Sequence, residues 1–252
     1  MSLKTPDFKV FVVVLAYNAQ KTIKNVIDEI PFEWVDKIII SDDDSTDKTY
    51  DLSKTISGVE VIKNKNNLHM GGNQKVVYNH AIENDADIVV VLHGDNQYDA
   101  SKIPDMIKPI IDSDADVVIG SRILGGMALK GGMPKYKYMG NIFLNFIQNT
   151  AFKLKLSDYA TGYKAYSRKV LTTIPYLKNR NDFIFDEQLN TQIVFFGFRI
   201  MQIGIPTRYF NEASSVNFLT SVHYGLWTVI TTLQFILAKN KIFTPKFLSK
   251  LA

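Results

Sequence analysis

Residues 88–98 read Ile-Val-Val-Val-Leu-His-Gly-Asp-Asn-Gln-Tyr, and the rest of the chain can be ordered around this stretch. It begins with five apolar residues, four of them β-branched, which is typical of a strand buried on both faces of a parallel sheet. Open α/β sheets bind ligands at the carboxyl ends of their strands. Oxygen ligands with one imidazole could hold a divalent metal there and, through it, a diphosphate; a solvated turn into a helix is the alternative. The polar residues at this end are His93, Asp95, Asn96 and Gln97.

Further apolar runs on both sides of this stretch alternate with segments that have helical spacing. The sequence predicts strands over 10–16, 37–40, 59–62, 88–92 and 116–119, and helices over 22–30, 50–56, 71–84 and 103–111. Strands that alternate with helices predict a doubly wound α/β sheet over roughly the first 120 residues.

The composition is that of a folded globular protein. The chain has 252 residues, of which 46% are hydrophobic and 21% charged, enough for one large α/β domain or two small ones. The absence of cysteine excludes disulfides, zinc–cysteine sites and thiol nucleophiles. A net charge of +4 without a nucleic-acid-binding motif predicts no nucleic-acid partner. The first residues show no secretory signal pattern, which favours an intracellular protein.

The pattern changes after Arg122. Residues 124–140 contain five glycines and three lysines, so we expect a mobile, basic stretch that could close over an anionic ligand. A plain flexible connector is the alternative. Helical spacing returns over 141–152, and a polar run follows over 157–164.

The end of the chain is predicted to hold an apolar helix. No charged residue occurs over 213–238, and 226–237 is strongly apolar, but scattered polar residues make it a poor transmembrane helix. An apolar helix with a lysine-rich flank suits the surface of a bilayer with anionic lipids. A buried helix closing the domain, or a homodimer interface, is the alternative. The flanking lysines are Lys239, Lys241, Lys246 and Lys250.

Polar clusters at three predicted strand ends should line one crevice, since these ends meet at one edge of a doubly wound sheet. The clusters are 17–18, 42–44 and 93–97. The chain lacks the glycine patterns of dinucleotide-binding Rossmann enzymes and P-loop kinases, and the nucleophile elbow of α/β hydrolases. A carboxylate-lined crevice suited to a nucleotide with a metal-bound diphosphate remains.

Four motifs follow one another along the chain: Val-Val-Leu-Ala-Tyr-Asn, Ile-Ser-Asp-Asp-Asp-Ser-Thr-Asp, His-Gly-Asp-Asn-Gln-Tyr-Asp and Gly-Ser-Arg. In this order they resemble the motifs of the family 2 glycosyltransferases of the GT-A fold. The segment 158–166, Asp-Tyr-Ala-Thr-Gly-Tyr-Lys-Ala-Tyr, is similar to one in the dolichol-phosphate mannose synthase branch. The resemblance spans about residues 9 to 225, and further matches lie at 185–188, 197–200 and 206–209.

The resemblance implies a UDP- or GDP-hexose donor with Mn²⁺ or Mg²⁺. Asp95 matches the last aspartate of the family's Asp-x-Asp motif, which binds the metal and diphosphate, and Gln97 matches a glutamine that can complete the metal shell. Arg122 would lie beside the sugar pocket. The nucleotide-binding residues implied by the match are Ala16, Tyr17, Asn18, Asp43, Asp44, Gly71, Gly72 and Asp95.

His93 departs from the family pattern, because it stands where the first aspartate of Asp-x-Asp would be. Imidazole binds manganese acceptably and magnesium poorly. His93 therefore either shifts the metal preference toward manganese or is not a ligand. We favour the second reading, with Asp95 carrying the metal.

The reaction implied is an in-line displacement that inverts the anomeric carbon, with the nucleoside diphosphate as leaving group. Polyprenyl (dolichyl) phosphate at the cytoplasmic membrane face is the expected acceptor. Its phosphate would be bound by Lys164 and Arg208, with the lysines of the 130–137 stretch as further candidates. A phosphate with a second pKa of about 6 is a nucleophile at neutral pH. A hydroxyl on a glycan or glycolipid would need a base, with Asp186 first and Asp158 second. A non-catalytic nucleotide-sugar-binding protein is the other alternative.

The expected organisation is therefore a GT-A domain over 1–212 and a C-terminal tail over 213–252. Residues 1–122 would form the nucleotide-binding half and 123–212 the acceptor half. We expect a cytoplasmic enzyme that lies on the inner face of the membrane.

Overall fold

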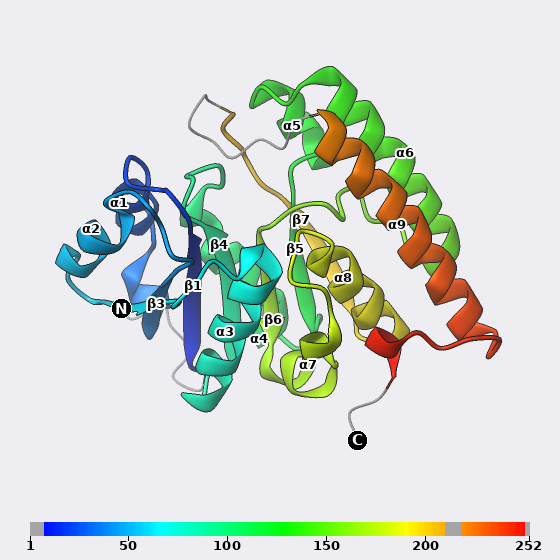
Figure 1. The fold of residues 1–252 in the computed structure, drawn as a ribbon, viewed down its shortest axis with the longest axis horizontal. Coiled ribbons are helices and arrows are strands. Elements are labelled where there is room, and N and C mark those ends of the chain that lie inside the picture. The colour runs from blue at the N-terminus through cyan, green and yellow to red at the C-terminus, as the bar shows by residue number, and fades with distance from the viewer. Residues whose placement is uncertain (1–7, 210–217, 250–252) are drawn as a thin grey trace.

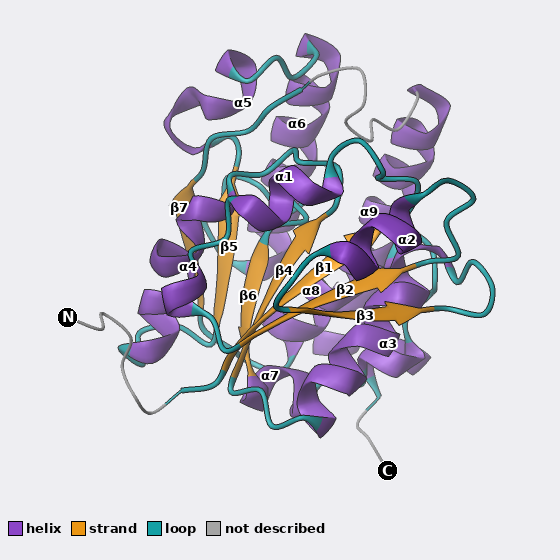
Figure 2. Ribbon diagram, turned by 90° about the vertical axis from the view of Figure 1, so that its left-hand side faces the viewer, coloured by secondary structure: helices purple, strands orange, loops and turns teal. Residues whose placement is uncertain are grey.

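The computed structural model describes residues 8–209 and 218–249. They form a seven-stranded, mostly parallel sheet in the order β3-β2-β1-β4-β6-β5-β7, flanked by helices (Figures 1 and 2). The predicted α/β class is confirmed. The strands are β1 (Val10–Ala16), β2 (Lys37–Asp42), β3 (Val59–Lys63), β4 (Ile88–His93), β5 (Val117–Ser121), β6 (Lys164–Ser167) and β7 (Ile200–Gly204).

Strand β1 lies at the centre of the parallel half and pairs with β2 and β4. Alternate side chains point to opposite faces of a strand, and here both faces are covered. Val12 is buried in one core and Val13 in the other, each with 0% of its surface exposed. This burial on two sides explains why β1 and β4 are continuous apolar runs. Their register places Leu15 beside His93, so both carboxyl ends lie at one edge of the sheet.

Strand β6 runs antiparallel to both of its neighbours, β4 and β5. The other pairings between the named strands are parallel, including β5 with β7. The sequence pattern predicts neither β6 nor β7. β6 has only four residues and follows directly on a polar run, so its sequence is too short to show the alternation of a strand.

The helices form layers on the two faces of the sheet. α1, α2 and α4 cover one face, and α3, α7 and α8 the other (Figure 2). The helices are α1 (Ile23–Asp28), α2 (Thr49–Thr55), α3 (His69–Glu83), α4 (Ile103–Ile111), α5 (Met127–Lys130), α6 (Lys135–Phe152), α7 (Arg168–Thr173), α8 (Phe185–Phe195) and α9 (Phe218–Lys239). Short 3-10 turns occupy Phe32–Trp34, Ala100–Lys102, Leu124–Gly126, Tyr176–Lys178 and Lys246–Leu248.

The stretch 124–140 is mostly helical, which corrects the expected loop. It contains a 3-10 turn, all of α5 and the first residues of α6. Gly126 and Gly132 have φ angles of 74° and 98°, so these glycines shape the turns at the ends of α5. Gly131 approaches the backbone of Thr207 so closely that a Cβ atom would lie 2.1 Å from its carbonyl oxygen. The glycines thus allow tight packing here.

The predicted apolar C-terminal helix is confirmed as α9. It lies beside α6 and against α8 (Figure 1), and the rings of Phe235 and Phe152 are 4.7 Å apart. Of the helices in the described residues, none has the length and apolar character needed to cross a membrane. The proposed domain boundary at 212 and Lys250 lie outside the described residues.

Candidate functional site

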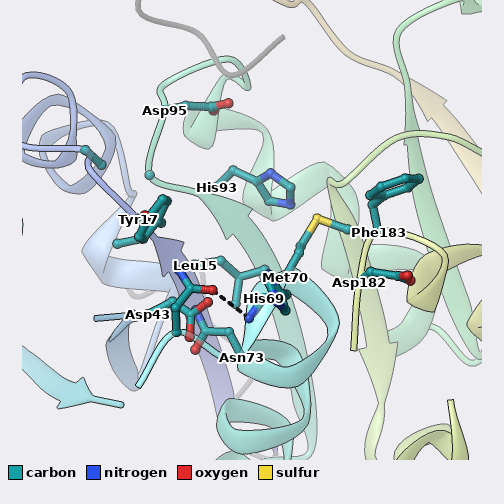
Figure 3. A pocket seen from close by; sticks show the side chains of 14 residues that line it. Leu15, Tyr17, Asp43, His69, Met70, Asn73, His93, Asp95, Asp182 and Phe183 are labelled. Carbon is teal, nitrogen blue, oxygen red and sulfur yellow. Dashed lines mark hydrogen bonds between the residues drawn. The ribbon is translucent and has the colours of Figure 1, made fainter. Parts of the chain in front are cut away.

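A first cavity of about 520 Å³ lies at the carboxyl ends of β1 and β4. Figure 3 shows Tyr17 and Asp43 on one side of it and Phe183 on the other, with His93 and Asp95 at one end. The cavity therefore forms where the sequence places its polar strand ends. It is also lined by Leu15, Ala16, Ala19, Asn67, His69, Met70, Asn73, Gly94 and Asp182.

Asp43 presents a fixed carboxylate to this cavity. Its Oδ1 accepts hydrogen bonds from Asn64 Nδ2 at 2.8 Å and from the Leu68 amide at 2.9 Å. The Asp43 amide donates to the carbonyl of Ala16 at 2.9 Å, which ties it to the end of β1. Tyr17 is 53% exposed and offers a free ring face at the rim. A positioned carboxylate and an aromatic ring suit the hydroxyls and the flat base of a nucleoside.

A second cavity of about 550 Å³ continues from the first, between the end of β4 and the helices α6 and α9. Its inner end is polar, and its outer end is apolar. The polar lining includes Asp95, Gln97, Arg122, Lys137 and Asp186, and the apolar lining includes Tyr136, Phe143, Leu144, Val222, Leu226 and Val229. The two cavities share the wall residues Met70, His93, Asp95 and Phe183.

Asp95 and Gln97 present oxygen atoms at the shared wall and in the second cavity. The backbone N–H of Gln97 donates to Asp95 Oδ1 at 3.1 Å, which fixes the turn after β4. Carboxylate and amide oxygens are ligands that Mg²⁺ and Mn²⁺ accept, so this pair fits a metal. No cluster of three or more His, Asp or Glu suited to a metal occurs within 8–209 and 218–249. A metal here would therefore take further ligands from the diphosphate.

His93 is packed against Gly162 rather than aimed at a partner. A Cβ atom on Gly162 would lie 2.5 Å from His93 Nε2, which shows how closely the ring approaches that backbone. This nitrogen is buried and has no hydrogen-bond partner among the described residues. Its ring also meets Tyr98 edge-on, with centroids 5.8 Å apart. The packing supports Asp95, rather than His93, as the metal-binding residue.

Arg122 is held at the second cavity by a two-point ion pair with Asp158. Arg122 Nε donates to Asp158 Oδ2 and Nη2 donates to Oδ1, both at 2.8 Å, and the Arg122 amide donates to Oδ2 at 3.0 Å. Burial lowers the pKa of Arg122, but Asp158, together with Tyr98 and Tyr209, raises it by more, so the guanidinium stays charged. Because both Asp158 oxygens are used in this way, Asp158 is better suited to position Arg122 than to act as a base.

Comparison with known proteins identifies the family. The model of glycosyl transferase family 2 matches residues 11–174, which cover most of the strands and all three polar strand ends. The chain belongs to glycosyltransferase family 2. As a member of this family it is an enzyme that transfers a sugar from a nucleotide sugar, which excludes a purely binding protein.

Individual relatives agree with this membership. The chain is 32% identical to a UDP-N-acetylglucosamine–dolichyl-phosphate N-acetylglucosaminyltransferase of Methanococcus voltae, over 67% of this chain and 73% of that protein. It is 26% identical to a dolichyl-phosphate hexose transferase of Haloferax volcanii, over 78% of this chain and 82% of that protein. Its fold is similar to that of glucosyl-3-phosphoglycerate synthase from Mycobacterium tuberculosis, solved with Mn²⁺ and UDP-glucose (TM-score 0.68, 18% identity, 94% of this chain and 80% of that chain).

Two residues that the family resemblance assigns to the nucleotide shape the loops beside it. Asn18 and Asp44 have φ angles of 52° and 61°, in the left-handed region that asparagine and aspartate tolerate. Asn18 Oδ1 accepts from the Thr46 amide at 2.9 Å, and the Asn18 amide donates to Ser45 Oγ at 2.9 Å. Neither Asn18 nor Asp44 lines the first cavity. Their direct contact with the nucleotide stays a prediction.

Gly71 and Gly72 bring α3 close to the segment before α8. Their amides donate to the carbonyl of Asn181 at 2.7 and 3.0 Å. A Cβ atom on Gly71 would lie 2.5 Å from Phe185 Cβ and 2.8 Å from the carbonyl oxygen of Arg180. Neither glycine lines either cavity. The expected glycine loop at the nucleotide is thus better explained as close helix packing that sets the position of the cavity wall.

Gly71→Ala is expected to lower the free energy of unfolding by about 1–3 kcal/mol, because the added Cβ atom would clash with the backbone of Arg180 and Asn181, which would have to shift. Gly140→Ala is the matched control in α6. Nothing lies within 4 Å of a Cβ atom at Gly140, so this change should raise stability by up to about 1 kcal/mol through helix propensity. Urea denaturation followed by circular dichroism measures both. Equal midpoints for Gly71→Ala and the wild type would contradict the packing role.

Asp186 lines the second cavity, and Lys164 lies behind it. Asp186 Oδ1 is 3.6 Å from Lys164 Nζ, and Oδ2 is 3.4 Å from Gln74 Nε2. Lys164 is only 1% exposed and donates to Asn190 Oδ1 at 2.9 Å. The predicted contact of Lys164 with an acceptor is therefore not supported by its position. Lys164 instead holds the carboxylate of Asp186 at the cavity wall.

Arg208 is engaged away from both cavities. Its Nη1 donates to Glu29 Oε1 at 2.7 Å and to Asn96 Oδ1 at 3.1 Å. It does not line the second cavity, so its position gives no support to the predicted contact with an acceptor phosphate. Arg208 ties the turn after β4 to α1.

Three site residues could not be singled out from the sequence. Met70 and Phe183 line both cavities, and Tyr224 of α9 lines the second. Each is an apolar or aromatic residue in a helical or irregular stretch, where core packing is the usual role. The one available signal was proximity, since Met70 precedes the glycine pair and Phe183 lies three residues before Asp186.

Proposed function

We propose that this enzyme transfers a hexose from UDP- or GDP-hexose to a polyprenyl phosphate, with inversion and with Mn²⁺ or Mg²⁺. The first cavity would hold the donor and the second the acceptor. The observation that carries the proposal is the second cavity itself, which shares Asp95 with the first, holds Arg122 and Lys137 in its polar part and is apolar at its outer end. A lipid phosphate, with its anionic head and apolar chain, complements these two parts.

Two cations at the inner end favour a phosphate. Burial lowers the pKa of Lys137, and the positive charge of Arg122 lowers it further. Lys137 has no hydrogen-bond or ion-pair partner within the described residues, whereas a bound phosphate would offset the repulsion between these two cations. Relatives named for transfer to dolichyl phosphate support the same acceptor class.

The geometry suits a direct displacement. Asp95 and Gln97 would hold the metal, which when bound supplies positive charge for the leaving diphosphate. Arg122, fixed by Asp158, would orient the acceptor phosphate so that one oxygen attacks the anomeric carbon from the side opposite to the leaving group. This phosphate is ionised at neutral pH, because its second pKa is about 6, and it needs no base.

A hydroxyl acceptor is the second candidate, and Asp186 favours it. Its carboxylate lines the second cavity and is 13% exposed, so it could reach the hydroxyl of an acceptor bound there, as a general base must. Transfer to a glycan or glycolipid hydroxyl should then depend on Asp186.

The test begins with thermal unfolding in the presence of UDP- and GDP-sugars, with manganese, magnesium or chelator, because a bound donor raises Tm by mass action. The matching labelled donor is then offered a short-chain polyprenyl phosphate or the corresponding polyprenol. We expect product with the phosphate only, and retained activity in Asp186→Asn. Transfer to a hydroxyl that is lost in Asp186→Asn would establish the second candidate instead.

A further inference from the structure

We infer that the solvent-facing side of α6 and α9 is a docking surface for an anionic lipid bilayer. We call it the α6–α9 face, and it comprises the exposed apolar side chains of these two helices. The inference deepens the proposed function, since it names how a membrane-held acceptor would be reached. Its test needs neither donor nor acceptor.

Helix α9 buries Phe235 and Ala238 near its end, but over most of its length its large aliphatic residues face away from the protein. Its threonines face the protein, with Thr228, Thr231 and Thr232 at 0%, 1% and 2% exposure. Its large aliphatic residues face outward, with Leu226 at 62% and Leu233 at 54%. A surface helix normally has its apolar stripe toward the core. An exposed aliphatic stripe opposite three buried threonines indicates that this stripe contacts something apolar.

Helix α6 adds a second exposed apolar stripe. Met139, Phe143 and Phe146 are 64%, 62% and 69% exposed, and Ile242 and Phe243 extend the apolar surface just after α9. Twelve of the nineteen exposed large apolar residues in the described chain lie on these two helices or directly after α9. Such a concentration marks an interaction site rather than the usual scatter of apolar surface residues. The remaining members of the two stripes are Tyr136, Ile142, Val222, Ile230 and Ile236.

The two helices are fixed to each other as one surface. A Cβ atom on Gly225 would touch Leu144, and Phe235 meets Phe152 further along, so the helices run in the same direction. Buried Glu187 of α8 joins them from below: it accepts hydrogen bonds from Gln148 Nε2 of α6, at 2.8 Å, and from the Tyr224 hydroxyl of α9. In Figure 1 the pair lies at the outer edge of the molecule.

The charge of the α6–α9 face identifies the occupant. Neither helix contains an Asp or Glu, and lysines lie at both ends of the pair: Lys135 and Lys137 at one, Lys153, Lys239 and Lys241 at the other. Basic residues beside an apolar helix face bind anionic lipid headgroups. A second copy of the chain is a poor occupant, because either orientation would bring lysines against lysines.

The second cavity connects this face to the chemistry. Its outer end is lined by Tyr136 and Phe143 from the α6 stripe and by Val222 and Leu226 from the α9 stripe. Docking would therefore place the cavity opening against the headgroup layer. A lipid phosphate could then reach Arg122 while its hydrocarbon chain stays in the bilayer.

The experiment is co-sedimentation of the full chain with vesicles that contain no polyprenyl phosphate. Vesicles of phosphatidylcholine alone are compared with vesicles that also contain phosphatidylglycerol. We expect binding to the anionic vesicles, and a loss of roughly tenfold in affinity for each of Phe146→Glu and Leu233→Glu, since each removes an inserted apolar side chain. Neither residue lines a cavity. Leu52→Glu on α2, where the side chain is 40% exposed, is the matched control and should bind like the wild type.

Unchanged binding of the Phe146→Glu/Leu233→Glu double variant, or no binding of the wild type, would overturn the inference. So would light scattering that shows a wild-type dimer and a monomeric double variant, since the face would then join two subunits. Transfer to a short-chain, water-soluble polyprenyl phosphate separates this inference from the proposed function. The double variant should keep that transfer activity. If the wild type lacks it, the result argues against polyprenyl phosphate as the acceptor and not against membrane docking by the α6–α9 face.

Discussion

Asp95→Asn is expected to lower kcat/KM for sugar transfer by about 10³-fold, through loss of metal-assisted stabilisation of the leaving diphosphate. Among the described residues, Asp95 is the one carboxylate that lines both cavities. His93 cannot replace it, because its Nε2 end is packed against Gly162. Asparagine keeps the size of the side chain and the acceptor for the Gln97 amide, so the turn after β4 should survive.

Steady-state kinetics and thermal unfolding with the sugar nucleotide, each with manganese or chelator, check this expectation. The matched control is Asp182→Asn, which removes a carboxylate of the first cavity that is paired with Arg180. It should change kcat/KM by less than about tenfold, since a partly exposed carboxylate that is already paired contributes little. A manganese-dependent rise in Tm that is the same in Asp95→Asn and the wild type would rule out Asp95 as the metal-binding residue.

Asp158→Asn is expected to lower the free energy of unfolding by about 3–5 kcal/mol, the usual cost of removing one partner of a buried ion pair. Asp158 is 0% exposed, and its two oxygens accept from Arg122 at 2.8 Å. An asparagine would leave a buried guanidinium without its countercharge and point an amide at one of its N–H groups. Activity should fall too, because Arg122 would lose the orientation that the proposed acceptor site needs.

Urea unfolding with matched activity assays measures this effect. Asp28→Asn is the control, since Asp28 forms an exposed pair with Lys24 that should contribute less than about 1 kcal/mol. If both variants unfold at the same urea concentration, the pair between Arg122 and Asp158 does not stabilise the fold as its burial indicates.

The parallel half of the fold could be predicted because its strands are buried on both faces. Val10–Ala16 and Ile88–Leu92 are apolar throughout, and in the helices between the strands an apolar residue recurs every three to four positions. The elements of residues 10–121 therefore follow the predicted order. The second half could not be predicted in the same way. Short β6 is placed by pairing with two strands far from it in sequence, and no local pattern records such pairing.

The site was predictable where function and local sequence coincide. Asp95 and Gln97 stand two residues apart after a buried strand, and the structure places both in the second cavity. Lys164 and Asp158 were harder, because burial and partners decide what a charged residue does. Lys164 is buried behind Asp186, and Asp158 forms a buried ion pair with Arg122. Residue type and spacing suggest chemistry, whereas tertiary contacts decide whether a charge meets a ligand or another side chain.

The position of β6 between β4 and β5 also constrains how the chain can fold. β4 and β5 follow each other in sequence, but they do not pair with each other, and residues 164–167 must arrive between them before the two are joined into one sheet. Closing that long loop is slow relative to pairing β1, β2 and β3, which are near one another in sequence. On a ribosome, the β3-β2-β1-β4 unit can therefore assemble while β4 still has one unpaired edge, the edge that β6 later covers. That edge is the point at which a nascent chain would be most exposed to aggregation.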